Sequence, residues 1–180
     1  MFKLILRHGI VAGLIVAAPM LWAMLTATEK EAHLGGMLVG YLTMLVALTA
    51  VFLGVKQYRD RIKGGVIRFL PALGVGLGIS VVASLIYSLS WEISIHFSKF
   101  DFAAWWQHQM IDGATARGAS PEELARVTQE AQDFAVMYAN PLYRIPMTFV
   151  EMFPVGVLVS LITAAVLRNP RVLPARAPAA

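Results

Sequence analysis

One uninterrupted apolar run dominates the sequence: LGGMLVGYLTMLVALTAVFLGV, residues 34–55. It contains no Asp, Glu, Lys or Arg. A helix that crosses the hydrocarbon core of a membrane needs about 20 largely apolar residues, so this run has the length and composition of one crossing. It predicts a transmembrane helix.

Three further segments, 9–28, 69–98 and 145–167, have the same character, with carboxylates only at Glu92 and Glu151. The whole chain is 58% hydrophobic and 14% charged, whereas soluble domains are about half apolar and a quarter charged. There is no cysteine, so disulfides and thiol catalysis are excluded. We predict an all-α polytopic membrane protein, in which residues 1–180 form a single membrane domain with four transmembrane helices.

Basic residues are distributed unequally between the two sides of this arrangement. Ten Lys and Arg lie before the first span, between the second and third, and after the fourth, while five lie on the opposite side. Because Lys and Arg are retained on the cytoplasmic side, both termini are predicted to be cytoplasmic. Anionic lipid headgroups on that side would account for the net charge of +4 without a nucleic-acid partner. The Pro-, Ala- and Arg-rich segment 170–180 is expected to be a disordered tail.

The connection 99–140 is the main polar part of the chain. Neither Gly nor Pro occurs in 80–111, so the third helix is expected to continue out of the membrane until Gly113. A second helix is predicted for 121–139, because Ser120 is a suitable N-cap with a Glu three residues later. Its apolar positions recur at helical spacing: Leu124, Val127, Ala131, Phe134 and Tyr138. We expect an extracytoplasmic helical hairpin over about 99–140, with a solvated connector as the alternative.

Small residues follow one face of the second span at a 4-3-4-3-4 spacing: Gly36, Gly40, Thr43, Ala47, Ala50 and Gly54. Helices in a bilayer associate through such residues because they allow close approach of two backbones. We therefore expect the second span to be the most tightly packed helix. The stripe indicates either packing within the bundle or an interface between copies of the chain.

The third span has a small or polar residue at every fourth position: Gly76, Ser80, Ser84, Ser88, Glu92 and His96. Four residues advance about 400° around a helix, so the stripe drifts by roughly 40° at each step. The hydroxyls could line a polar seam. They could equally lie on a packing face, bonded back to carbonyls of their own helix.

Glu92 and Glu151 are the costly residues, because a carboxylate at membrane depth has to be paired, protonated or turned inward. Both lie about six residues from the same end of neighbouring spans, roughly 9 Å inside by helical rise. Arg144 is the natural cation in reach, and His96 lies one turn from Glu92. We predict one polar cluster of Glu92, His96, Arg144 and Glu151 in the outer half of the bundle, serving either as a structural ion pair or as a proton site.

Enzymatic and metal-binding patterns are not met. Glu92 with His96, and His108 with Asp112, have the i, i+4 spacing of zinc ligands, but neither pair belongs to a His-Glu-x-x-His motif. The Gly-rich segment 74–78 lies inside an apolar span, where it cannot act as a dinucleotide loop. We expect no enzymatic activity, no metal and no cofactor.

Two motifs resemble a known family. Tyr58-Arg59-Asp60-Arg61 with Gly64-Gly65 follows the second span, and Asn140-Pro141-Leu142-Tyr143-Arg144 leads into Met147-Thr148-Phe149-Val150-Glu151-Met152-Phe153-Pro154-Val155-Gly156. In these segments the chain resembles the bacterial membrane family catalogued as domain of unknown function 4199, over nearly its whole length. The resemblance implies a bacterial inner-membrane protein and supplies no reaction, substrate or catalytic residue.

The sequence favours a protein that acts by association. We expect a structural or accessory subunit that forms a homo-oligomer or binds a partner membrane protein. The alternative is a small channel or a proton-coupled transporter that uses Glu92 and Glu151.

Overall fold

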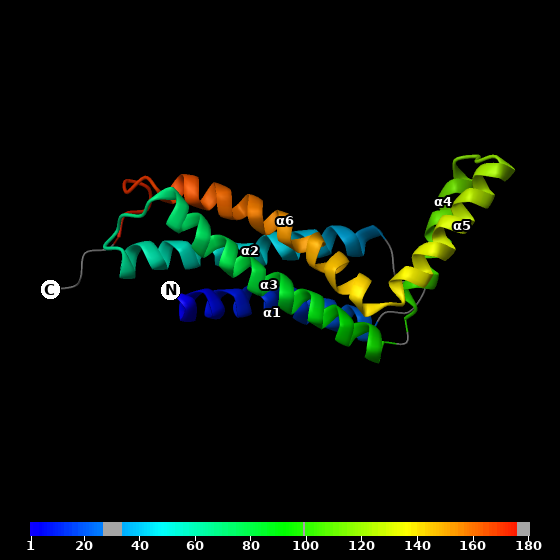
Figure 1. Cartoon of the computed structure of the whole chain (residues 1–180), viewed down its shortest axis with the longest axis horizontal. Helices are drawn as coiled ribbons and strands as arrows, with labels where there is room; N and C mark the ends of the chain where they lie inside the picture. Colours follow the sequence, from blue (N-terminus) through cyan, green and yellow to red (C-terminus); the bar gives the residue numbers. More distant parts are fainter. Residues whose placement is uncertain (27–33, 99, 176–180) are drawn as a thin grey trace.

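The computed structural model describes residues 1–26, 34–98 and 100–175, which form six helices and no strand. Four long helices lie along one another as an elongated bundle: α1 (Phe2–Thr26), α2 (Leu34–Ile62), α3 (Phe69–Phe97) and α6 (Pro141–Leu167) (Figure 1). Each is long and apolar enough to cross a membrane. The predicted all-α fold with four candidate spans is confirmed.

A separate helical pair, α4 (Phe102–Ala116) and α5 (Pro121–Tyr138), projects from one end of the bundle (Figure 1). We call this pair the arm. The end of the bundle at Phe97 and Pro141, from which the arm projects, is the arm end. The opposite end, where α2 ends, α3 begins and α6 ends, is the basic end.

Two helix boundaries differ from the sequence expectation. α2 continues past its apolar run to Ile62, since Lys and Arg are good helix formers, and the chain turns only where Gly64 and Gly65 take positive φ angles of 66° and 90°. α3 ends at Phe97 and not at Gly113. The break there is made by polar caps without any Gly or Pro: Asp101 accepts a hydrogen bond from the Ala104 amide at 3.0 Å and starts α4.

α3 is the central helix and packs against α1, α2 and α6. Gly156 of α6 lies so close to α3 that a Cβ there would be 2.7 Å from the Cβ of Ser80, and Gly76 of α3 has the same relation to Ser160 at 2.9 Å. The Ser80 and Ser160 hydroxyls lie 3.2 Å apart, and each also donates to a carbonyl of its own helix. The interior between α3 and α6 is therefore closed by reciprocal Gly–Ser contacts.

The small stripe of α2 is buried only toward the basic end. Ala47, Ala50 and Gly54 are buried, and a Cβ at Gly54 would lie 2.5 Å from Cδ1 of Ile79. Among the described residues none lies within 4 Å of the Cβ position of Gly40, and Thr43 is half-buried. The surroundings of Gly36 lie outside the described residues. The expectation that α2 packs most tightly is wrong, because small residues allow close approach without enforcing it.

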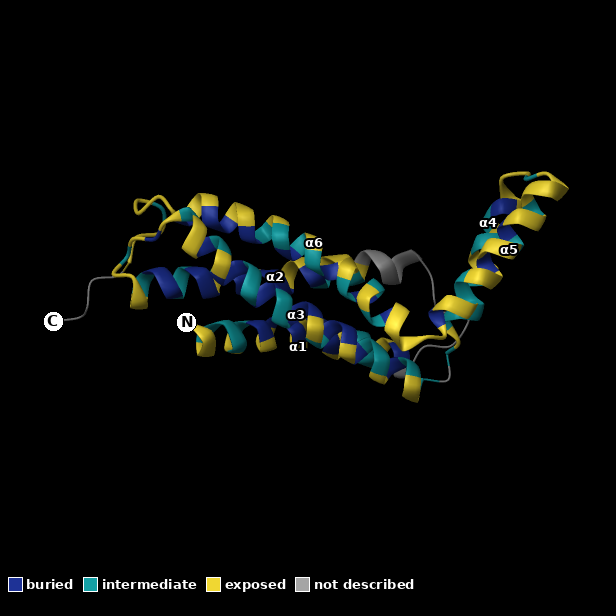
Figure 2. Cartoon of the chain, in the orientation of Figure 1, coloured by how far each residue is buried: buried dark blue, intermediate teal, exposed yellow. Residues whose placement is uncertain are grey.

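Exposed and buried residues alternate along the long helices (Figure 2). Large apolar side chains such as Leu14, Leu45, Leu89 and Leu158 are exposed on the outer faces of the four long helices. In a membrane such faces would contact acyl chains. The buried polar residues on the inner faces are therefore the candidates for a functional site.

Candidate functional site

The arm end holds an ion pair between two spans. Arg144, in the first turns of α6, donates from Nε to Oε1 of Glu92 at 2.6 Å and from Nη2 to Oε2 at 2.7 Å. Its Nη1 donates to the carbonyl of Tyr138 at 2.8 Å. Two parallel charge-assisted bonds fix both distance and orientation. The pair therefore joins α3 to α6 and, through Tyr138, to the end of α5.

Local sequence places the two partners at one level. Asn140 caps α6 by accepting from the Leu142 amide at 3.0 Å, and Pro141 takes the first helical position. Arg144 then lies one turn inside α6, opposite Glu92 near the end of α3. Only 10% of the Arg144 side chain and 19% of the Glu92 side chain are exposed, so each charge depends on the other.

Aromatic side chains join the arm to this ion pair. Trp91 donates from Nε1 to the Tyr138 hydroxyl at 2.6 Å. The ring of Phe102 lies 5.3 Å from both Trp91 and Tyr138, and the Arg144 guanidinium lies 5.4 Å from the Tyr138 ring. Burial raises the pKa of Tyr138 above its usual range, so the phenol stays neutral while its oxygen accepts the Trp91 N–H. These contacts join the base of the arm to the ends of α3 and α6.

The other two predicted members lie apart from this pair. His96 is exposed and has an edge-to-face contact with Phe97. The 40° drift of the stripe explains this placement, because two steps beyond Ser88 carry the side chain off the buried face. Glu151 is also exposed, on the side of α6, and accepts a hydrogen bond from the Tyr87 hydroxyl at 3.3 Å. Among the described residues, the structure joins Glu92 to Arg144, and neither His96 nor Glu151 has a hydrogen bond or ion pair with them.

Two of the three serines in the stripe of the third span follow the packing interpretation. Ser80, Ser84 and Ser88 are fully buried. The hydroxyls of Ser80 and Ser88 donate to the carbonyl four residues earlier, as does that of Ser94, which lies outside the stripe. The hydroxyl of Ser84 has no hydrogen-bond partner among the described residues.

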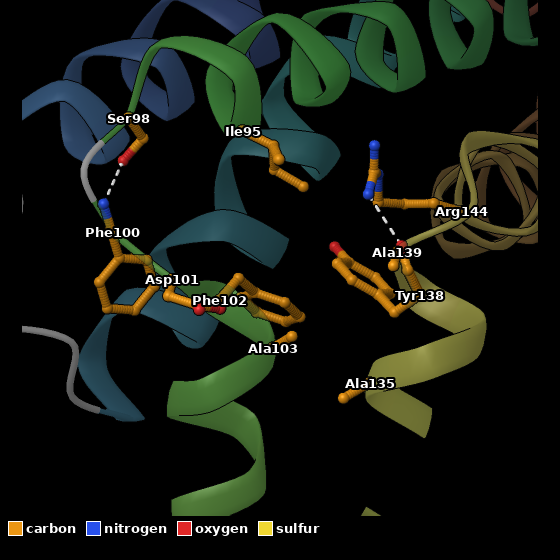
Figure 3. Close-up of a pocket in the computed structure, with 10 residues that line it drawn as sticks. All are labelled: Ile95, Ser98, Phe100, Asp101, Phe102, Ala103, Ala135, Tyr138, Ala139 and Arg144. Carbon is orange, nitrogen blue, oxygen red and sulfur yellow. Dashed lines mark hydrogen bonds between the residues drawn. The ribbon is translucent and has the colours of Figure 1, made fainter. Parts of the chain in front are cut away.

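A cavity of about 400 Å³ lies where the arm meets the bundle. Figure 3 shows Phe100, Asp101 and Phe102 on one side of it and Tyr138, Ala139 and Arg144 on the other. Among the described residues its walls are mainly aromatic and aliphatic, with one carboxylate and one guanidinium. Sequence reasoning gave no indication of this cavity, because its two walls come from segments about 40 residues apart in the chain.

Sequence reasoning also missed a second buried arginine, at the basic end. Arg59 is fully buried and donates from Nε to Asp60, from Nη1 to the carbonyl of Val172 at 2.9 Å and from Nη2 to that of Leu173 at 2.5 Å. The expected disorder from residue 170 is therefore wrong for the described residues 170–175, while 176–180 lie outside them. The one available signal was an Arg-Asp pair within the Tyr58-Arg59-Asp60-Arg61 motif.

The fold and the site define a class: a multi-pass α-helical membrane protein with a polar arm fixed to one end of the bundle. The chain belongs to the family described as "Protein of unknown function (DUF4199)", which matches residues 7–169. The resemblance carried by the two motifs is thereby confirmed. Comparisons with curated proteins and with solved structures give no match.

Proposed function

We propose that this protein is a non-enzymatic structural or accessory subunit of the bacterial inner membrane. It acts by associating with a second copy or with a partner membrane protein. The single observation that carries the proposal is the arm: a helical pair joined at its base to the bundle by hydrogen bonds and aromatic contacts, with a long exposed face.

The exposed face of the arm is acidic. On α5 the exposed residues include four carboxylates and one cation: Glu122, Glu123, Glu130, Asp133 and Arg126. The apolar residues Val127, Ala131 and Tyr138 of α5 are buried, whereas Val136 and Met137 near its end are exposed. The rest of the outer helix surface is negatively charged, and a complementary partner would present Lys or Arg.

Site-specific photo-crosslinking tests this proposal. A photoreactive residue at the exposed Gln132 of α5 should give a discrete protein adduct in the membrane, and Glu130→Lys with Asp133→Lys should weaken it. The matched control is the exposed, apolar position Leu45 on α2, where adducts with lipid are expected. Two differently tagged copies in one cell distinguish a homo-oligomer from another partner. A monomeric chain with no protein adduct at Gln132 would refute the proposal.

Glu151 supports a second candidate, a proton-coupled transporter or channel. It is an exposed carboxylate within a candidate span, bonded to Tyr87, with the unpartnered Ser84 hydroxyl one turn further along α3. Glu92 supports it less, because Arg144 occupies both of its oxygens. In vesicles loaded with a pH-sensitive dye, Glu151→Gln should abolish proton flux while leaving the thermal unfolding unchanged. A wild-type protein without flux would leave the accessory role as the better account.

A further inference from the structure

We propose that the cavity at the base of the arm binds the headgroup of a zwitterionic phospholipid, with the phosphate at Arg144 and the ammonium group at Asp101. The proposal is independent of the function argued above. It rests on the charges of the two cavity walls, their aromatic lining and their level in the membrane.

Arg144 has donors left for an anion. A guanidinium carries five N–H groups. Among the described residues, three of them have acceptors, two on Glu92 and one on the Tyr138 carbonyl. One N–H remains on each terminal nitrogen, and Arg144 lines the cavity. A phosphate oxygen would satisfy these donors at a position that the protein itself leaves open.

Asp101 supplies the opposite charge on the facing wall. One carboxylate oxygen caps α4 through the Ala104 amide, and the residue is exposed and lines the cavity. The ring of Phe102 next to it offers an aromatic face, and aromatic faces attract ammonium groups. Glu92 already compensates the charge of Arg144, so a headgroup with a neutral group in place of the ammonium leaves the Asp101 carboxylate without a counter-charge. The two walls together fit a zwitterion better than an anion.

The level of the cavity favours a lipid over a soluble ligand. Its lining includes Ile95 near the end of α3 and Arg144 near the start of α6, so it lies where two candidate spans leave the apolar core. Exposed apolar side chains flank these helix ends, with Phe97 67% and Leu142 82% exposed. Acyl chains lying against such residues would bring a headgroup to the cavity. Its volume of about 400 Å³ lies within the usual range of ligand pockets, about 300–1,000 Å³.

Native mass spectrometry of the purified full chain tests the proposal. The protein in detergent is mixed with equimolar phosphatidylethanolamine and phosphatidylglycerol, and the ratio of the two adducts is measured. The wild type should retain more phosphatidylethanolamine. Asp101→Asn keeps the N-cap acceptor and removes the charge, so it should lower the ratio roughly threefold. The matched control, Asp112→Asn on the same helix, should not change it. Equal retention of both lipids by the wild type, or an unchanged ratio in Asp101→Asn, would overturn the proposal.

Two further measurements complete the test. Ala103→Phe fills the cavity without touching a charge, so it should remove the preferred adduct, and a folded variant that keeps the adduct would overturn the proposal. Soluble O-phosphoethanolamine at millimolar concentration lacks acyl chains and should not displace the lipid. Full displacement would assign the site to a soluble zwitterion and overturn the lipid assignment.

Discussion

The two ends of the bundle each bury an arginine, and the two arginines are held in different ways. At the arm end, Arg144 forms a bidentate pair with Glu92 of another span. At the basic end, Arg59 contacts the adjacent Asp60 and two carbonyls of the chain's last described segment. The arm end is therefore closed by two opposite charges on separate helices. The basic end is closed by one helix and a terminal segment.

This difference predicts how much each end depends on its arginine. Breaking a buried pair leaves an uncompensated charge, which is among the costliest single changes. Asp60 remains close to Arg59 whatever the terminal segment does, and it also pairs with Lys56. Losing the carbonyls of Val172 and Leu173 removes hydrogen bonds without isolating a charge. The arm end should therefore be the more sensitive of the two.

The largest effect is expected for Arg144→Met. It leaves Glu92 buried without its cation and should lower the free energy of unfolding by about 3 kcal/mol. Unfolding in detergent, followed by tryptophan fluorescence, measures this loss. Adding Glu92→Met should recover part of it, because the isolated charge is then gone. Arg126→Met, which breaks the exposed Arg126–Glu130 pair of α5, should cost only about 0.5 kcal/mol. A double variant less stable than Arg144→Met would contradict the ion-pair interpretation.

At the basic end, Arg59→Met should cost about 2 kcal/mol, the value for charge-assisted hydrogen bonds lost from a buried group. Deletion of residues 170–180 removes the same two carbonyl acceptors from the other side. Because both changes break one interaction, combining them should cost little more than either alone. The control is Arg61→Met, because Arg61 lies two residues further along α2 and is exposed. Fully additive losses would show that the terminal segment and Arg59 stabilise the protein independently.

A smaller loss of stability is expected at the α3–α6 contact, which lies between the two ends of the bundle. Gly156→Ala places a methyl group 2.7 Å from the Cβ of Ser80, so the helices must move apart at a cost of about 1–2 kcal/mol. Gly40→Ala, in open space on α2, should cost nothing and gain helix propensity. Melting temperatures of the two variants in detergent measure the difference. Equal destabilisation would mean that α2 packs near the arm end as closely as α3 and α6 do.

Local rules were sufficient for much of this fold. Apolar run length located four helices, and the Ser120 cap located the start of α5, where its hydroxyl accepts from the Glu123 amide at 3.2 Å. The end of α3 was missed because polar caps, not Gly or Pro, make that break. Depth alone placed Glu92 level with Glu151, but Glu92 pairs with Arg144. The sequence indicated this partner only as the one cation in reach of a carboxylate on the adjoining helix.

Position around the helix could not be predicted from spacing alone. His96 shares a stripe with Ser88 but has rotated off the buried face. Gly40 shares a stripe with Gly54 but has no close neighbour in the part of the chain that the structure describes. Spacing specifies which residues share a face and not which part of that face meets another helix. Arg59 was counted only as a cytoplasmic cation, since its partners come from a terminal segment whose path no local pattern defines.

The smallest expected effect tests whether the ion pair alone fixes the arm. Trp91→Phe keeps an aromatic ring beside Phe102 and removes the N–H that donates to the Tyr138 hydroxyl, which should cost about 1 kcal/mol. Because the chain has no cysteine, spin labels on Cys at the exposed positions Ala116 of α4 and Arg61 of α2 report the distance from arm to bundle without further changes. If Arg144 is the main attachment, the distance distribution should broaden slightly in Trp91→Phe and clearly in Arg144→Met. Trp105→Phe, whose indole has no hydrogen bond among the described residues, should leave it unchanged. A broader distance distribution in Trp91→Phe than in Arg144→Met would show that the aromatic contacts, and not the ion pair, are the main attachment of the arm. The two ends of the bundle would then differ less than their arginines suggest.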